Sequence, residues 1–438
     1  MNKTAAVVGG GFAGVEAALQ LARRGVHVDL YEMKPHRYSP AHSSENLAEL
    51  VCSNSFKAER LASAAGLLKA EMEALGSVCV ACAKQTKVPA GGALAVDRDK
   101  FSALVTSMVN EEKNITVHRK EVSELPEADC VIIAAGPLAS DALSAVLNTL
   151  CGEGLHFFDA AAPIVTAESV DMQFAFAQSR YDRGGAEDYI NCPMNKEEYD
   201  LFYEALINAD SAHLHAVDKK KDVYEGCMPI EVLAKRGRDA IRYGPMKPVG
   251  LVNPHTGHRP WAVLQLRKEN DKGTLYNLVG FQTNLKFGEQ QRVFSMIPAL
   301  KNARFERFGV MHRNTFIDSP RLLNCHFQLK SRPHIFFAGQ ITGVEGYMES
   351  AASGILAGIN AYRYLMGDPL LTLPETTMLG AFSAYIADES IHNFQPMGAA
   401  MGLLPPAEEK IRDRAARYEY LSNRSMAALK KVIAEELL

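Results

Sequence analysis

This chain of 438 residues has few cysteines, no strong excess of charge of either sign and no long apolar run. Its eight cysteines are too few for a disulfide scaffold in a chain of this length. No uncharged apolar run reaches the roughly 18 residues that a membrane helix needs. The first expected strand, at residues 4–8, leaves no room for a targeting leader. We therefore expect a cytoplasmic protein with reduced thiols and no membrane anchor.

The charge balance is close to neutral, with 47 basic against 51 acidic residues and a formal net charge of -4. This excludes a surface that is basic throughout, so a polyanionic partner would have to bind a local basic patch. The length exceeds the roughly 250 to 300 residues at which single hydrophobic cores stop growing. We expect two domains.

The N-terminal residues predict a βαβ unit, because AAVV, GGGFAG, VEAALQLARR and VHVDLYE read as strand, glycine turn, helix and strand. CVIIAAG, at residues 130–136, predicts a further strand that ends in small residues. IFFAGQ, from Ile335, predicts a late return to the same sheet. These strands indicate a parallel sheet whose ligand crevice lies at the carboxyl ends of the strands.

Gly9, Gly11 and Gly14 form a G-x-G-x-x-G between the first strand and the helix, and Glu32 closes the second strand. We expect Gly9 to make the turn, Gly11 to let backbone amides reach a pyrophosphate, and Gly14 to pack helix against strand. The helix N-terminus adds partial positive charge, and Glu32 is placed to bind ribose hydroxyls. The alternative is a glycine-rich turn in an unrelated α/β fold.

This fingerprint is shared by FAD and NAD proteins, so it does not choose between the two cofactors. Two-dinucleotide flavoproteins carry a late strand that ends in Gly-Asp and leads into a helix facing the flavin. IFFAGQITGVEGYMESAASG has that form, with Gln340 in place of the acid. The combination favours tightly bound FAD, with a nicotinamide cofactor only as a visiting co-substrate.

The middle of the chain differs from both ends, because it is charged, rich in aromatic residues and contains alternating strands such as WAVLQLRKEN and TLYNLVGFQTNL. Alternation of this kind indicates antiparallel pairing. We therefore expect an α/β protein in which residues 1–165 and 330–438 form a discontinuous Rossmann-type FAD-binding domain and residues 166–329 form an inserted α+β domain. The tail, residues 408–438, predicts one or two charged surface helices.

Two cysteines lie among polar, turn-forming residues, Cys52 in ELVCSNSFK and Cys227 in YEGCMPIE. Such thiols can be exposed and activated, although from the residues alone an ordinary half-buried cysteine is the favoured interpretation of each. Cys79 and Cys82 form a C-x-x-C without a second pair spaced for zinc, so we expect them to be core residues and expect no metal site.

A basic segment, AKRGRDAIRYGPMKPVG, follows Cys227. It could bind RNA phosphates beside a reactive thiol, or it could be a solvated basic face. The candidate RNA-binding residues are Lys235, Arg236, Arg238 and Arg242.

Seven blocks together resemble the TrmFO family, the folate- and FAD-dependent tRNA (uracil-5-)-methyltransferases, nearly from end to end. The GidA-type wobble-uridine enzymes are more distant, since they are longer and lack this combination. The blocks are GGGFAG, ELVCSNSFKAER, VPAGGALAVDR, DAAAPIV, YINCPMNKEEYDLFYEAL, YEGCMPIEVLAKRGRDAIRYGPMKPVGL and FFAGQITGVEGYMESAASG.

The resemblance implies methylation of uracil C5 in the tRNA T-loop, giving 5-methyluridine, with methylenetetrahydrofolate as carbon donor and NAD(P)H as reductant. A thiolate that adds to uracil C6 makes C5 nucleophilic, and reduced flavin would supply two electrons and carry the methylene on N5. By resemblance, Cys227 attacks the uracil and Cys52 lies beside the flavin. The implied FAD contacts are Gly9, Gly10, Gly11, Phe12, Ala13, Gly14, Glu32, Gly136, Gly339 and Gln340.

Three alternatives remain at this point. The same chemistry could act on a ribosomal RNA uridine. The chain could be a flavin-dependent NAD(P)H oxidoreductase that uses Cys79 and Cys82. It could also be a non-catalytic RNA-binding protein that contains FAD, and such a protein would tolerate loss of both Cys52 and Cys227.

Overall fold

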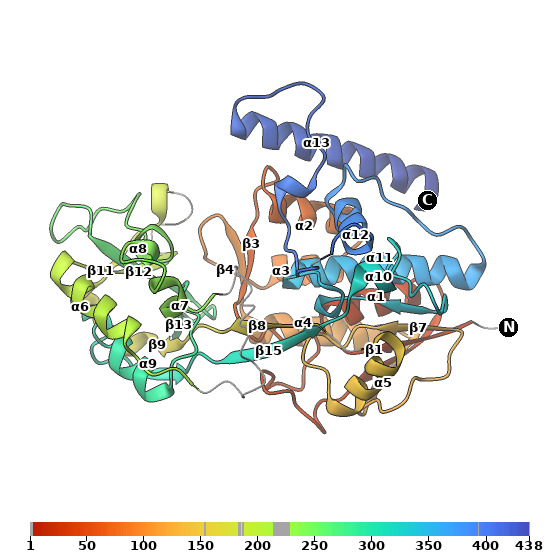
Figure 1. The fold of residues 1–438 in the computed structure, drawn as a ribbon, viewed down its shortest axis with the longest axis horizontal. Coiled ribbons are helices and arrows are strands. Elements are labelled where there is room, and N and C mark those ends of the chain that lie inside the picture. The colour runs from red at the N-terminus through yellow and green to blue at the C-terminus, as the bar shows by residue number, and fades with distance from the viewer. Residues whose placement is uncertain are drawn as a thin grey trace.

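A five-stranded parallel sheet lies at the centre of the first of two lobes in the computed structural model (Figure 1). The structure describes residues 3–152, 155–182, 185, 188–212, 228–392 and 394–437. Three of the strands, at residues 4–8, 130–133 and 335–337, are buried apolar runs, as in sheets covered on both faces. Every neighbouring pair of strands is parallel, as the sequence predicts. In spatial order they are β16 (Ile335–Phe337), β7 (Cys130–Ile133), β1 (Thr4–Val8), β2 (His27–Glu32) and β6 (Ile115–Arg119).

Two helices from opposite ends of the sequence pack closely against each other, α1 (Phe12–Ala22) and α11 (Tyr347–Met366). Their closeness depends on small residues. A Cβ atom added to Gly354 would lie 2.2 Å from the carbonyl oxygen of Ala13. Helix α1 begins at Phe12, inside the glycine turn, and so brings its N-terminus to the carboxyl end of β1.

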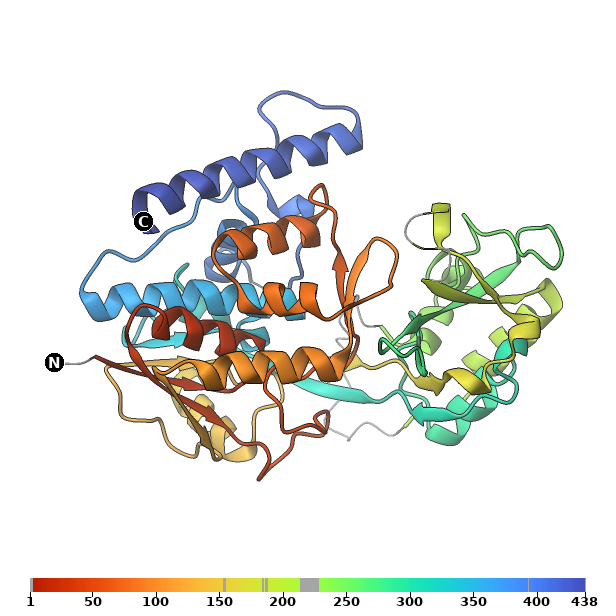
Figure 2. The ribbon, with the colours of Figure 1, turned by 180° about the vertical axis from the view of Figure 1, so that it is seen from behind.

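Other helices of the first lobe pack on the pair formed by α1 and α11 and on one another. Helix α13 (Arg414–Val432) packs on α2 (Ala64–Ala74) (Figure 2). Ser422 of α13 donates a hydrogen bond to the carbonyl oxygen of Leu61. Of the described residues, no helix has the length and apolar character to span a membrane. These helices are α2 (Ala64–Ala74), α3 (Val78–Gln85), α4 (Arg98–Glu111), α5 (Asp141–Cys151), α10 (Ser319–Leu322), α12 (Met378–Ala387) and α13 (Arg414–Val432).

A small antiparallel sheet lies on the side of the first lobe that faces the second lobe. It consists of β3 (Ser55–Ala58), β5 (Ala93–Val96) and β4 (Lys87–Val88). The turn between β4 and β5 touches the second lobe, because the hydroxyl group of Tyr189 donates a hydrogen bond to the carbonyl oxygen of Ala90 at 3.0 Å. This sheet therefore forms part of the wall between the lobes.

The second lobe is built on a six-stranded antiparallel sheet with a hydrophobic core of its own. Its helices are α6 (Lys196–Ile207), α7 (Ile230–Ala234), α8 (Ala240–Tyr243) and α9 (Phe287–Phe294). The strand order is β10 (Phe176–Ala177), β11 (Tyr189–Met194), β12 (Ala262–Lys268), β13 (Leu275–Leu278), β9 (Ile164–Thr166) and β14 (Phe305–Arg307).

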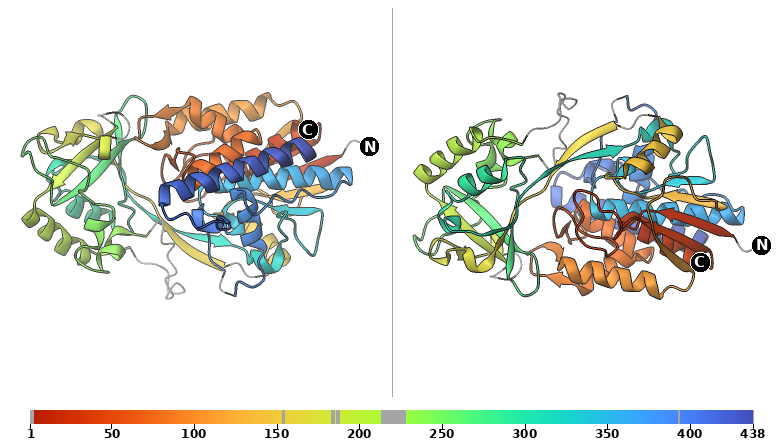
Figure 3. Two further views of the ribbon diagram at one scale, coloured as in Figure 1. Left: turned by 90° about the horizontal axis from the view of Figure 1, so that it is seen from above. Right: turned by 90° about the horizontal axis from the view of Figure 1, so that it is seen from below.

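Two antiparallel strands, β8 (Leu155–Ala160) and β15 (Met311–Phe316), join the lobes (Figure 3). The chain enters the second sheet at Ile164 of β9, while Phe316, Leu323 and Leu329 pack in the core of the first lobe. We propose a division into domains at this two-stranded ladder, which lies within a few residues of the expected first boundary and before the expected second one.

Candidate functional site

The glycine turn after β1 is shaped by close backbone contacts. Gly9 has φ +110°, and a Cβ atom there would lie 2.4 Å from the carbonyl oxygen of Ala134. A Cβ atom on Gly14 would lie 1.8 Å from the carbonyl oxygen of Gly9. At Gly11 the situation is reversed, because no described atom lies within 4 Å of an added Cβ. Gly9 and Gly14 are therefore needed by the fold, whereas Gly11 keeps a space open.

Glu32 is fixed at the end of β2 by two backbone amides. Its carboxylate oxygens accept hydrogen bonds from the N–H groups of Gly10, at 3.1 Å, and Lys34, at 3.0 Å. The side chain is thereby held against the glycine turn, where the sequence places a ribose-binding acid.

The turn and Glu32 line a cavity with about 1090 Å³ of empty space at the carboxyl ends of the parallel strands. Gly136 (φ +69°) and Gly339 (φ +86°) complete it at the ends of β7 and β16. Gly14 lies behind the wall of this cavity. The other expected FAD positions line it, namely Gly9, Gly10, Gly11, Phe12, Ala13, Glu32, Gly136, Gly339 and Gln340.

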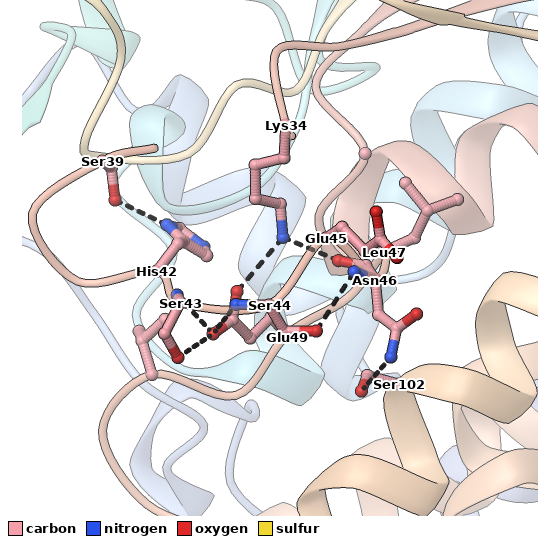
Figure 4. Close-up of polar contacts among 12 residues, drawn as sticks. Lys34, Ser39, His42, Ser43, Ser44, Glu45, Asn46, Leu47, Glu49 and Ser102 are labelled. Carbon is pink, nitrogen blue, oxygen red and sulfur yellow. Dashed lines mark hydrogen bonds and ion pairs between the residues drawn. The ribbon is translucent and has the colours of Figure 1, made fainter. Parts of the chain in front are cut away.

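The loop after β2 forms another wall of this cavity through a polar network (Figure 4). At its centre is Glu49, which forms an ion pair with Lys34 at 3.2 Å, both side chains being almost fully buried. Glu49 also accepts hydrogen bonds from the backbone N–H groups of Ser43 and Ser44, at 2.8 and 3.1 Å. A buried charge pair with this many hydrogen bonds holds the loop in one conformation.

A second cavity, with about 1400 Å³ of empty space, lies between the lobes. It is lined by Cys52 from the first lobe and by Arg267, Asn277 and Gln282 from the second. The buried amide nitrogen of Asn277 has no hydrogen-bond partner within the part of the chain that the structure describes. An unsatisfied buried donor in a cavity wall is available to a ligand or to a water molecule. The two cavities share Val51, Pro137, Leu138, Gln340 and Tyr347.

Cys52 is half-buried and lies against the first turn of α11. Its Sγ is 3.0 Å from the hydroxyl oxygen of Tyr347. The same hydroxyl accepts the backbone N–H groups of Val51 and Cys52, at 2.9 and 2.8 Å. Tyr347 thus fixes both the backbone and the side chain of the Cys52 loop.

Three arginines hold the same loop from other directions. Arg98 donates to the carbonyl oxygens of Leu50 and Cys52, at 2.7 and 3.1 Å. Arg307 donates to the carbonyl oxygen of Val51 at 2.8 Å. Arg267 donates to the side chains of Ser53 and Asn54, at 2.9 and 3.0 Å. The sequence did not predict a role for Tyr347 or for these arginines, because their contacts join segments that are far apart in the chain.

Cys79 and Cys82 lie in the core of the first lobe, as expected, with 0% and 1% of their surfaces exposed. Burial raises the pKa of Cys82 to about 11, and it raises the pKa of Cys79 well above its ordinary value. Neither thiol suits a redox role at neutral pH. Within the described ranges, no group of three or more His, Cys, Asp or Glu residues could hold a metal ion.

The basic segment lies on α7, α8 and the turn between them, where Lys235, Arg236 and Arg238 are exposed. Arg238 is paired with Asp200 at 2.9 Å, so part of its charge is neutralised. Arg242 is different, because it lies 3.9 Å from the ring centroid of Trp261 and donates to the Trp261 carbonyl oxygen at 3.0 Å. Arg242 therefore has a packing role, whereas the other three face solvent.

Cys227 lies outside the residues that the structure describes, so its position relative to these cavities stays a prediction. Ile230, three residues further along the chain, donates its backbone N–H to the carbonyl oxygen of Gln282 at 2.7 Å. Gln282 lines the second cavity. The described chain therefore resumes, after the gap, next to the wall of that cavity.

The first cavity fits a dinucleotide cofactor on structural grounds. The turn keeps space open at Gly11, at the N-terminus of α1, where an anionic pyrophosphate is favoured. Glu32 is held where ribose hydroxyls would bind. Gln340 and Tyr347 mark the end of this cavity that meets the second one. The first cavity therefore opens toward the second one, which Cys52 lines.

Comparisons with known proteins agree with this architecture. A family model described as glucose inhibited division protein A (GIDA) matches residues 4–369. The chain is 55% identical over 430 residues to the methylenetetrahydrofolate--tRNA-(uracil-5-)-methyltransferase TrmFO of Acetivibrio thermocellus, with 98% of each chain covered. It is 53% identical over 431 residues to the protein of the same name from Lactobacillus acidophilus, again with 98% of each chain covered.

Among solved structures, GidA of Aquifex aeolicus has a similar fold, with a TM-score of 0.70 at 16% sequence identity. The match covers 98% of this chain and 74% of that chain. At this identity the likeness concerns the fold, and it agrees with a Rossmann-type domain that carries an inserted second lobe.

Proposed function

This chain belongs to the TrmFO family, within the wider GIDA group, and from that premise we propose that it methylates C5 of a uracil in the T-loop of tRNA. The carbon donor is methylenetetrahydrofolate and the product is 5-methyluridine. We propose NAD(P)H as the reductant. FAD bound in the first cavity and reduced by NAD(P)H would supply the two electrons that turn a methylene into a methyl group.

The observation that carries this proposal is the junction of the two cavities. The glycine turn and Glu32 line the first cavity, Cys52 lines the second cavity, and Gln340 and Tyr347 line both. A dinucleotide bound at the glycine turn would reach the second cavity, which is large enough for further ligands. We propose that folate and the target uracil bind there, with the free amide N–H of Asn277 as one contact.

In this proposal the cysteines have separate tasks. Cys227 adds to C6 of the uracil and thereby makes C5 nucleophilic, and it leaves again when the C5 proton has been lost. Cys52 lines the second cavity beside Val51 and Tyr347, which line both cavities, and assists the transfer of the carbon. The segment that contains Lys235, Arg236 and Arg238 would bind RNA phosphates beside the second cavity. It directly follows α7, whose first residue, Ile230, donates a hydrogen bond to Gln282 in the wall of that cavity.

The proposal is tested by a reaction with defined components. The purified protein is incubated with methylenetetrahydrofolate labelled in its methylene carbon, NADH or NADPH, and tRNA that lacks 5-methyluridine. We expect the label in 5-methyluridine at the T-loop and no product when S-adenosylmethionine replaces folate. A product that forms only in a ribosomal RNA transcript would move the substrate to that RNA. Oxidation of NAD(P)H without a methylated product in either RNA would contradict the proposal.

A further inference from the structure

The hydroxyl group of Tyr347 has an unusual set of contacts for a half-buried tyrosine. Two backbone N–H groups, of Val51 and Cys52, point to its oxygen at 2.9 and 2.8 Å. The third contact is the Sγ atom of Cys52, at 3.0 Å. A phenolic oxygen has two lone pairs and one proton. The two N–H groups occupy the lone pairs, so the proton is left for the sulfur.

The direction of this hydrogen bond follows from the protonation state of the tyrosine. Burial raises the pKa of Tyr347 well above its ordinary value, and the nearby Cys52 thiol adds to this effect, while Arg98 opposes it. The phenol therefore keeps its proton at neutral pH, and the hydroxyl donates to Sγ. A donor stabilises a thiolate more than a neutral thiol, because hydrogen bonds to charged groups are stronger.

The charged groups nearest to Cys52 act in the same direction. Arg98 and Arg307 both interact electrostatically with the Cys52 thiol. Glu269 neutralises one of these positive charges through its ion pair with Arg98. Arg267 contacts the residues that follow Cys52 in the loop. The balance around the sulfur is therefore positive.

The remaining charged groups on the wall of the second cavity are Lys57, Glu345 and Glu349. Lys57 and Glu349 form an ion pair at 2.7 Å and so largely cancel each other. Glu345 accepts a hydrogen bond from the side chain of Gln340 at 2.7 Å. These groups leave the local excess of positive charge in place, and thiols in such surroundings ionise readily.

We propose that Tyr347 is a positioning residue that donates its phenolic hydrogen bond to Cys52 and holds this cysteine as a reactive thiolate facing the second cavity. The inference rests on the proposed function for the catalytic use of Cys52, and on the structure alone for the state of its sulfur. The hydroxyl also fixes the sulfur in place, because the same oxygen accepts the backbone N–H groups of Val51 and Cys52.

The test is the pH profile of alkylation of Cys52 by iodoacetamide in the full-length protein purified with its FAD. The rate is followed for the Cys52 peptide by mass spectrometry and needs neither folate nor RNA. In Tyr347→Phe, the loss of one hydrogen bond to a charged sulfur predicts an alkylation rate at neutral pH that is roughly tenfold lower or more, with a midpoint about one pH unit higher. Tyr362→Phe, on the same helix but away from Cys52, is the matched control and should leave the profile unchanged.

A second variant separates the hydrogen bond from the anchoring of the loop, because Tyr347→Phe also removes the acceptor for two backbone N–H groups. Replacement of Tyr347 by 2,3-difluorotyrosine keeps the oxygen and makes the phenol a stronger acid. Below the pKa of that phenol, the alkylation midpoint of Cys52 should move to lower pH, opposite to the shift in Tyr347→Phe. Midpoints that stay at the wild-type value in both variants would overturn the proposal. If these shifts occur but the wild type makes no 5-methyluridine, the proposed function fails and the inference about Cys52 stands.

Discussion

Replacement of Gly11 by valine separates cofactor binding from folding. Gly11 has φ -78° and ψ -171°, a backbone conformation that any residue adopts. No described atom lies within 4 Å of a Cβ placed there. The Cβ of the added side chain would therefore enter the space of the first cavity without a close contact with the fold. We expect the free energy of unfolding of the cofactor-free protein to change by about 0.5 kcal/mol or less.

The expected decrease in FAD affinity follows from the groups at the N-terminus of α1. If valine keeps the pyrophosphate away from two backbone N–H groups, the absence of each hydrogen bond weakens binding by roughly 1.5–3 kcal/mol. The dissociation constant should rise by roughly 10²- to 10⁴-fold. The assay is the flavin absorbance per polypeptide after purification, followed by titration of the cofactor-free protein with FAD.

Two glycine variants serve as comparisons. In Gly14→Val the Cβ would lie 1.8 Å from the carbonyl oxygen of Gly9, so the fold itself should be destabilised by about 1–3 kcal/mol or more. Gly402→Val is the matched control, because Gly402 is exposed and also has no described atom within 4 Å of an added Cβ. Our assignment of the cavity would be refuted if Gly11→Val bound FAD as tightly as the wild type, or if Gly402→Val lost it equally.

Two further predictions concern RNA binding and pH. Removal of Arg236 and Arg238 should reduce the slope of log affinity for tRNA against log salt concentration by about 1 for each RNA phosphate that is no longer neutralised. Arg321→Ala, an exposed arginine of the first lobe, should not change this slope, and an unchanged slope in the double variant would place the RNA elsewhere. Burial lowers the pKa of Lys69 to about 8 from 10.5, so between these pH values the unfolded state binds more protons than the folded state. The free energy of unfolding of the wild type, relative to Lys69→Met, should therefore rise from pH 8 to pH 10.5 by up to about 3 kcal/mol in urea denaturation, and a constant difference would contradict this.

The parts of the fold that the sequence predicted correctly are those with local signals. The apolar runs that became β7 and β16 are short and continuous, as expected for strands buried on both faces. The glycine turn could be recognised from the spacing of its glycines. The structure gives the reason for two of them, because backbone atoms next to Gly9 and Gly14 leave no room for a side chain. Cys79 and Cys82 were predicted to be core residues from the apolar stretch around them.

The surroundings of Cys52 could not be predicted in the same way. Arg98 is 46 positions away from Cys52 in the sequence and Tyr347 is 295 positions away, yet both contact the same short loop. Their meeting depends on the packing of α11 and on the approach of the second lobe, and neither leaves a periodic pattern in the sequence. The ion pair between Lys34 and Glu49 in the wall of the first cavity could not be predicted for a similar reason. Both residues lie in the loop after β2, and the conformation of a loop leaves no periodic pattern in the sequence.

The nucleophile itself is the subject of the most direct test. A tRNA that carries 5-fluorouracil at the T-loop target is incubated with the protein, methylenetetrahydrofolate and NAD(P)H, and the covalent complex is digested and mapped by mass spectrometry. Fluorine cannot leave as a proton does, so a cysteine that adds to C6 remains bound to the RNA. We predict an adduct on Cys227 in the wild type, the same adduct in Cys52→Ser, and none in Cys227→Ala, which should still bind FAD. An adduct that persists in Cys227→Ala, or normal 5-methyluridine formation by that variant on ordinary tRNA, would contradict the account.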